Sequence, residues 1–124
     1  MATRSTIALR KSDGTVKQSY CHWDGYLEGV GATLKEFYNT EEKVEALVDL
    51  GDLSSLEASI ECPEGHTFDT KIGGYTVAYG RDRGEENVGV TIFKDVDNFE
   101  TNKRGEDYNY LFTNGEWECD GKKF

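Results

Sequence analysis

At the start of the chain, hydrophobic and polar residues alternate with the two-residue period of a β-strand. Two such runs, residues 6–9 and 15–21, flank Asp13-Gly14. Asp-Gly between strand-like runs is a strong hairpin signal, because both central positions of the favoured turn require a positive φ. The pattern therefore predicts an N-terminal β-hairpin that leads into the aromatic segment 20–26.

The period then changes to that of an amphipathic helix. The apolar residues of the first predicted helix recur at i, i+4, i+7 and i+8; they are Val30, Leu34, Phe37 and Tyr38. Thr40 is suited to cap a second helix over about 41–50. Its first turn carries Glu41 and Glu42, where carboxylates favour the helix dipole. Gly51 follows, where a helix C-cap needs a left-handed residue.

Strand patterns return in the second half of the chain. The elements indicated there are a strand at 75–79, a strand through Val88, Val90 and Ile92, and a short helix at 95–99. The clearest hairpin joins 108–113 to 116–119 through Asn-Gly at 114–115, which puts Phe112 opposite Trp117. Strands, then helices, then strands predict an α+β fold: an antiparallel sheet built from hairpins with a helical pair packed on one face.

Composition fits one domain over residues 1–124, with a frayed tail at 120–124. A chain of 124 residues with 36% hydrophobic residues can bury a core of its own. Its apolar runs are far shorter than the ~20 residues of a membrane span, and residues 1–6 lack an apolar signal-peptide core. Three widely spaced cysteines suit reduced thiols. We therefore expect a cytoplasmic protein that does not contact a membrane.

The charge is strongly acidic and unevenly distributed. The net charge is −10, and residues 28–64 carry ten acidic against two basic side chains. Such a surface repels DNA and anionic lipid, so direct DNA binding is not expected. It is compatible with a basic protein partner.

The residue types of a zinc site are present without its spacing. Neither a CxxC nor an HxxxH pair occurs among the residues concerned, which are Cys21, His22, Cys62, His66 and Cys119. Catalysis by Cys21, His22 and Asp24 is disfavoured, because neighbouring residues on a strand point to opposite faces. We expect no catalytic residue, no metal, no cofactor and no enzymatic activity.

Two arginines offer a candidate ligand site. Arg81 and Arg83 lie two residues apart in a polar loop, and their guanidinium groups suit phosphate or carboxylate. Together with stacking on Trp23 and Tyr26 they would make a nucleotide pocket. The alternatives are a solvated turn for the arginines and a structural anchor for the two aromatic residues.

A second candidate site is an acidic row on the helix at 41–50. Glu41, Glu45 and Asp49 recur at i, i+4 and i+8, which predicts an uncompensated carboxylate ridge. A regular acidic row could imitate nucleic-acid phosphates and bind a basic partner. A solvated helix face is the alternative.

Several motifs resemble those of small uncharacterised proteins from bacteriophages and prophages. They are Thr3-Arg4-Ser5-Thr6-Ile7-Ala8, Tyr20-Cys21-His22-Trp23-Asp24-Gly25-Tyr26, Gly51-Asp52-Leu53-Ser54-Ser55-Leu56, Tyr79-Gly80-Arg81-Asp82-Arg83-Gly84-Glu85 and the closing Tyr110-Leu111-Phe112 with Gly115-Glu116-Trp117. Where such sequences often read Gly-Tyr-Pro, this chain has Leu27.

The resemblance implies a context and brings no established activity. Small acidic phage proteins made in the host cytoplasm are often counter-defence factors, so we expect a non-catalytic protein that captures a nucleotide-like ligand or a host defence protein. An acidic nucleic-acid mimic and a virion assembly accessory are the alternatives. A ligand site shared between two copies of the chain would make it a homo-oligomer.

Overall fold

The structure is a computed structural model that describes residues 3–56, 77–78, 89–102, 105–113, 115–120 and 122–123. The strands are β1 (Ser5–Arg10), β2 (Val16–Cys21), β3 (Leu53–Ser55), β4 (Val77–Ala78), β5 (Thr91–Phe93), β6 (Tyr108–Thr113), β7 (Glu116–Cys119) and β8 (Lys122–Lys123). The helices are the π-helix η1 (Leu27–Gly31) and the α-helices α1 (Ala32–Phe37), α2 (Glu41–Val48) and α4 (Val96–Asn102). None of the helices among the described residues is long and apolar enough to cross a bilayer.

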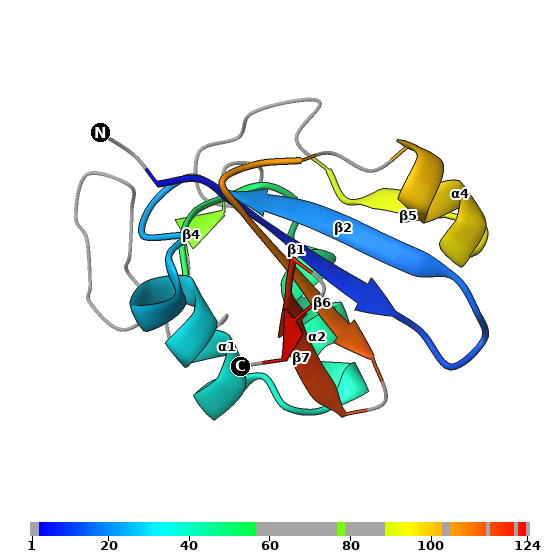
Figure 1. Ribbon diagram of the computed structural model, residues 1–124, viewed down its shortest axis with the longest axis horizontal. Helices are drawn as coiled ribbons and strands as arrows, with labels where there is room; N and C mark the ends of the chain where they lie inside the picture. Colours follow the sequence, from blue (N-terminus) through cyan, green and yellow to red (C-terminus); the bar gives the residue numbers. More distant parts are fainter. Residues whose placement is uncertain are drawn as a thin grey trace, which may run out of the picture.

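All the strands belong to one mixed sheet with the order β4-β3-β2-β1-β6-β7-β8, and β5 also pairs with β2. Figure 1 shows the long strands β1, β2 and β6 side by side. The predicted α+β class is confirmed. The sheet is largely antiparallel, but β1 pairs in parallel with β6, and β2 in parallel with β3. Hairpin signals do not reveal these two pairings, because they join strands far apart in sequence.

Both predicted hairpins form, but in the first turn only Gly14 has the positive φ that was expected of both Asp13 and Gly14. β1 and β2 pair in register from Ser5 opposite Cys21, and Gly14 takes a φ of 94° in their turn. In the C-terminal hairpin, Phe112 lies opposite Trp117, as the Asn-Gly turn predicts. We predicted a frayed tail at 120–124, but residues 122–123 form β8 and pair with β7.

The main core lies between one face of the sheet and the helices η1, α1 and α2. Buried residues of η1, α1 and α2 join a single cluster with the inward residues of β1, β6 and β7; its members include Ile7, Leu9, Val30, Leu34, Val44, Leu47, Tyr110, Phe112 and Trp117. Thr40 caps α2 as predicted, because its hydroxyl accepts a hydrogen bond from Lys43 N. Gly51 takes the expected positive φ after that helix.

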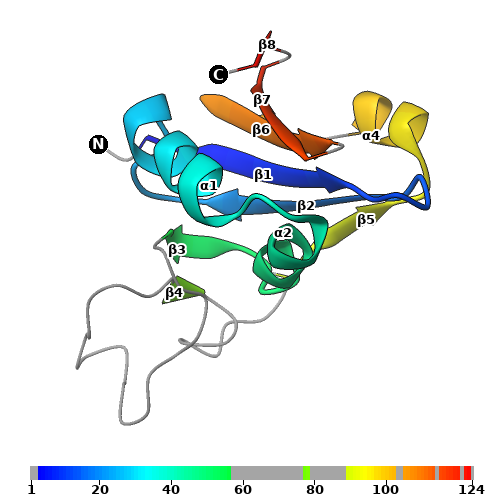
Figure 2. The same cartoon turned by 90° about the horizontal axis from the view of Figure 1, so that it is seen from below.

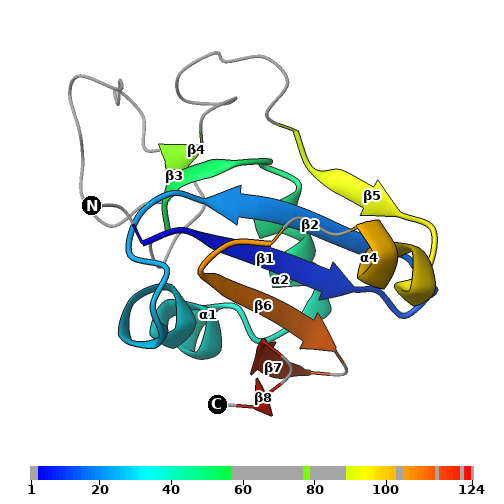
Figure 3. The same cartoon turned by 45° about the horizontal axis from the view of Figure 1, so that its top comes forward.

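The opposite face of the sheet carries α4 at one end. Figure 3 shows α4 in front of the strands and α2 behind them. Phe99 of α4 packs on Phe93 of β5 with 5.2 Å between ring centroids, and Val16 joins the same small cluster. The sequence predicts β5 from the alternating residues Val90 and Ile92. In the structure, however, Phe93 is the buried residue of the strand, and Ile92 is 61% exposed. The cause is the register, which sets Phe93 opposite Val16.

Candidate functional site

A sharp backbone corner at residues 22–26 connects β2 to η1 and packs against the start of β1. Asp24 takes a φ of 57°, a left-handed conformation that Asp tolerates better than most residues. Gly25 N donates to Thr3 O at 2.8 Å, and a Cβ at Gly25 would come within 2.8 Å of the Cβ of Ser5. Only a glycine therefore lets the corner approach the start of β1 this closely.

Two further contacts tie the corner to the rest of the molecule. The buried hydroxyl of Tyr110 donates to Gly25 O at 2.7 Å, which links the corner to β6. Val30 N donates to Asp24 O at 2.8 Å, so the corner also closes onto η1. Gly29 permits this, because a Cβ there would lie 2.3 Å from Asp24 O. Figure 2 shows how η1 and α1 lie over this end of β1 and β2.

The aromatic side chains of the corner face solvent. Trp23 is 45% exposed and Tyr26 is 38% exposed, so neither is the core anchor that the sequence allowed as an alternative. The Trp23 ring meets His22 edge to face, with 4.8 Å between centroids, and the hydroxyl of Tyr20 lies 2.6 Å from His22 Nδ1. The corner is anchored through its backbone, which leaves its aromatic rings available for contact.

One of the two exposed aromatic side chains of the corner, Tyr26, has carboxylates close to it. The hydroxyl of Tyr26 donates to Asp24 at 3.3 Å. The negative charge of Asp24, assisted by that of Glu28, raises the pKa of Tyr26. Asp24 and Glu28 are both exposed. The electrostatic character of this surface is therefore anionic.

Cys21, the last residue of β2, lies in the main core, where its thiol has low reactivity. It is fully buried, its thiol donates to Trp23 O, and burial raises its pKa to about 12. Such a thiol is almost wholly protonated near neutral pH and is a poor nucleophile. Cys62 and His66 lie outside the described residues. Within the described part of the chain, no three His, Cys, Asp or Glu residues gather into a possible metal site.

Of the four residues of the predicted nucleotide pocket, the structure places two. Trp23 and Tyr26 both belong to the corner and lie three positions apart in the chain, and both are exposed. Arg81 and Arg83 lie outside the described residues. Their proximity to the corner stays a prediction.

The acidic row on α2 is compensated, which makes the predicted uncompensated ridge wrong. Lys17 bonds to Glu45 at 2.9 Å and to Asp49 at 2.8 Å, and Lys11 bonds to Glu45 at 2.8 Å. Glu41 accepts from Ser12 N at 3.0 Å. The lysine hydrogen bonds lower the pKa of Glu45. The carboxylates thus join α2 to the β1–β2 hairpin, a contact that a charge count along the helix alone does not reveal.

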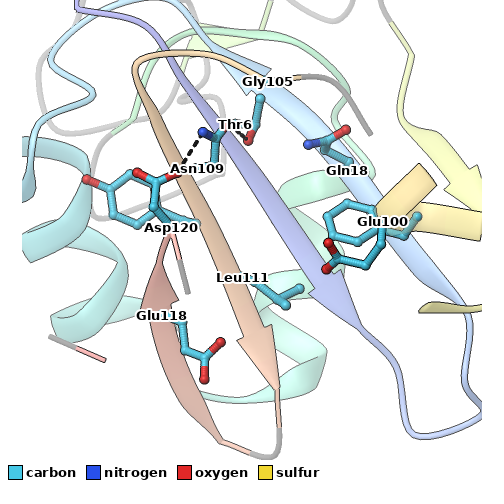
Figure 4. A pocket seen from close by; sticks show the side chains of 10 residues that line it. Thr6, Gln18, Glu100, Gly105, Asn109, Leu111, Glu118 and Asp120 are labelled. Atoms are coloured by element: carbon cyan, nitrogen blue, oxygen red, sulfur yellow. Dashed lines mark hydrogen bonds between the residues drawn. The ribbon is translucent and has the colours of Figure 1, made fainter. Parts of the chain in front are cut away.

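Sequence reasoning missed a cavity of about 260 Å³ on the face of the sheet that carries α4. Figure 4 shows side chains from β1, β2, β6, β7 and α4 around it, among them Thr6, Gln18, Glu100, Asn109, Glu118 and Asp120. Asn109 accepts from Thr6 and donates to Asp120, both at 2.8 Å, so it is engaged in structure. The described residues of the lining include carboxylates and no Lys or Arg, which favours a cation over an anion. These residues come from several strands, from α4 and from the turn after β7, and no local motif marks them.

In comparisons with known proteins, no protein-family model, curated protein or solved structure matches the chain.

Proposed function

We propose that the protein is a non-catalytic binding protein that captures another molecule through the corner at residues 22–26. The observation that carries this proposal is the combination of two large exposed aromatic side chains, Trp23 and Tyr26, with a backbone fixed by buried contacts. Trp and Tyr are the residues most enriched among energetic hot spots of interfaces. A pre-formed backbone lowers the ordering cost of binding.

The partner that fits this surface best is a host protein, and the motif resemblance supports a counter-defence role in a bacteriophage setting. A nucleotide-like ligand remains the alternative for the same corner, with Arg81 and Arg83 as phosphate ligands. The acidic mimic gains no support, because Glu45 and Asp49 are engaged by lysines. No specific observation favours a virion role.

The test is capture from a lysate of the bacterial host by wild type and by Trp23→Ala/Tyr26→Ala, with mass spectrometry of the bound proteins and small molecules. Ile92→Ala is the matched control, because Ile92 is also a large exposed hydrophobic residue but lies on β5. We expect the double variant to lose its captured molecule by at least about tenfold, as removal of hot-spot residues does. The control should retain it.

A thermal-shift screen with mono-, di- and cyclic nucleotides separates the two kinds of partner. Stabilisation by a nucleotide that disappears in Trp23→Ala/Tyr26→Ala would favour the small-ligand version. Equal capture by wild type and by the double variant would refute the proposal for this corner altogether.

A further inference from the structure

The corner has a specific chemistry beyond being aromatic and exposed. Residues 20–31 contain Asp24 and Glu28 and no Lys or Arg. Tyr26 lies between these two carboxylates in the chain and is bonded to the first of them. An aromatic surface with carboxylates beside it is complementary to a cation, because the face of each ring and the carboxylate oxygens are all negative.

The same arrangement is unfavourable for a phosphate. Fixed carboxylates repel an anion, and residues 20–31 contain no Lys or Arg to offset Asp24 and Glu28. Among the described residues, the basic residue that the fold brings next to the corner is Arg4, whose backbone lies against Gly25. Arginine fits instead, because its planar guanidinium can stack on Trp or Tyr while its N–H groups donate to a carboxylate. Arginine is also, with Trp and Tyr, one of the three typical hot-spot residues of protein interfaces.

The conformation that this contact needs is already present. The left-handed Asp24 is held by the bond from Val30 N to Asp24 O, and Gly25 is held by Thr3 and Tyr110. The hydrogen bond with Tyr26 keeps the Asp24 carboxylate beside that ring. The net charge of −10 adds a long-range attraction for a basic partner, which raises the association rate.

We infer that the corner binds a basic segment of a protein partner by receiving an arginine side chain against Trp23 and Tyr26, with Asp24 and Glu28 as its counter-charges. This inference rests on the proposed function and narrows it to one chemistry of partner. It assigns Asp24 and Glu28 to recognition, in addition to the two aromatic residues.

The experiment titrates the protein with a short Gly-Arg repeat peptide and with the same peptide carrying citrulline in place of arginine. Citrulline keeps the shape of the side chain and removes its charge. Binding is followed by NMR through the indole N–H resonances, of which only Trp23 is exposed, since Trp117 is 5% exposed and bonded to Tyr38 O. We expect the arginine peptide to shift the Trp23 resonance and the citrulline peptide to leave it in place.

The variants Asp24→Asn/Glu28→Gln and Glu42→Gln/Asp97→Asn make a matched pair. All four carboxylates are exposed, so each double variant changes the net charge equally. Asn also tolerates the left-handed backbone of residue 24, so the first variant should fold. The corner variant should bind the arginine peptide at least about tenfold more weakly, the control by a factor of about three or less, and wild-type binding should weaken with salt.

Equal affinity for the two peptides, or equal weakening by the two double variants, would overturn the inference. If Trp23→Ala/Tyr26→Ala still abolishes capture from lysate in that case, the proposed function survives with a partner of another chemistry. If the aromatic variant captures as wild type does, the proposed function itself fails.

Discussion

The substitution Gly29→Ala tests the closed corner, because its expected effect is opposite to the usual one. In most helical positions the change from Gly to Ala stabilises a protein by about 0.5–1 kcal/mol. At position 29 the new Cβ would lie 2.3 Å from Asp24 O and 3.2 Å from a ring carbon of Tyr26. Real Cβ atoms essentially never approach closer than 3.0 Å, so the Asp24 carbonyl must retreat by about 0.7 Å.

The cost of that retreat can be worked out from the contacts. Forced overpacking costs about 1–3 kcal/mol, and loss of the hydrogen bond from Val30 N to Asp24 O costs about 1 kcal/mol. After the helix-propensity gain is subtracted, the free energy of unfolding should fall by roughly 1–3 kcal/mol. Because Asp24 would move relative to Tyr26, binding at the corner should weaken as well.

Urea unfolding followed by circular dichroism measures this directly, as a lower midpoint at an unchanged slope. Gly105→Ala is the control, because a Cβ there would meet nothing within 4 Å. It should change the free energy of unfolding by less than about 1 kcal/mol, in either direction. A Gly29→Ala variant as stable as wild type, or more stable, would show that the corner does not close onto η1 in this way.

Three further outcomes follow from single contacts. Thr40→Ala removes the cap of α2 and should cost about 1 kcal/mol in urea unfolding, whereas Thr101→Ala on α4 should cost less. Glu45→Gln should make the free energy of unfolding less dependent on acid pH. The pKa of Glu45 is lowered in the folded protein, so its carboxylate contributes stability above the ordinary pKa of 4.5, and this contribution is lost as the pH falls through the lowered pKa. The effect in urea unfolding at pH 3 and pH 7 should be small, because the group is partly exposed. At pH 8 iodoacetamide should leave Cys21 unmodified until urea unfolds the protein, and rapid native alkylation at that residue by peptide mass spectrometry would contradict its burial.

The sequence predicts best those elements whose causes are local. The turn at Gly14, the cap at Thr40 and the pairing of Phe112 with Trp117 each depend on residues a few positions apart. The parallel pairing of β1 with β6 depends on packing between distant segments, and no local pattern encodes it. Distance along the chain is what separates the correct predictions from the missed ones.

The candidate sites show the same division. Trp23 and Tyr26 are exposed, and Gly25 between them packs against the start of β1, a contact with a distant segment that no local pattern reveals. The acidic row on α2 was predicted to lack counter-charges, because the lysines that pair with it, Lys11 and Lys17, belong to the β1–β2 hairpin and not to the helix. The charge of a surface includes side chains that become neighbours only in the folded state. The sequence of one helix does not contain those from other elements.

The central position of β1 has a consequence for how the chain is made. Its partner in the sheet lies 103 positions later, as the bond between Thr6 and Asn109 shows. At a synthesis rate of about 5–20 residues per second, β1 and β2 wait roughly 5–20 seconds on the ribosome with one edge of β1 unpaired. An open edge of this kind invites pairing with another chain, so yield in cells should depend on chaperones and on translation speed more than the stability of the finished sheet suggests.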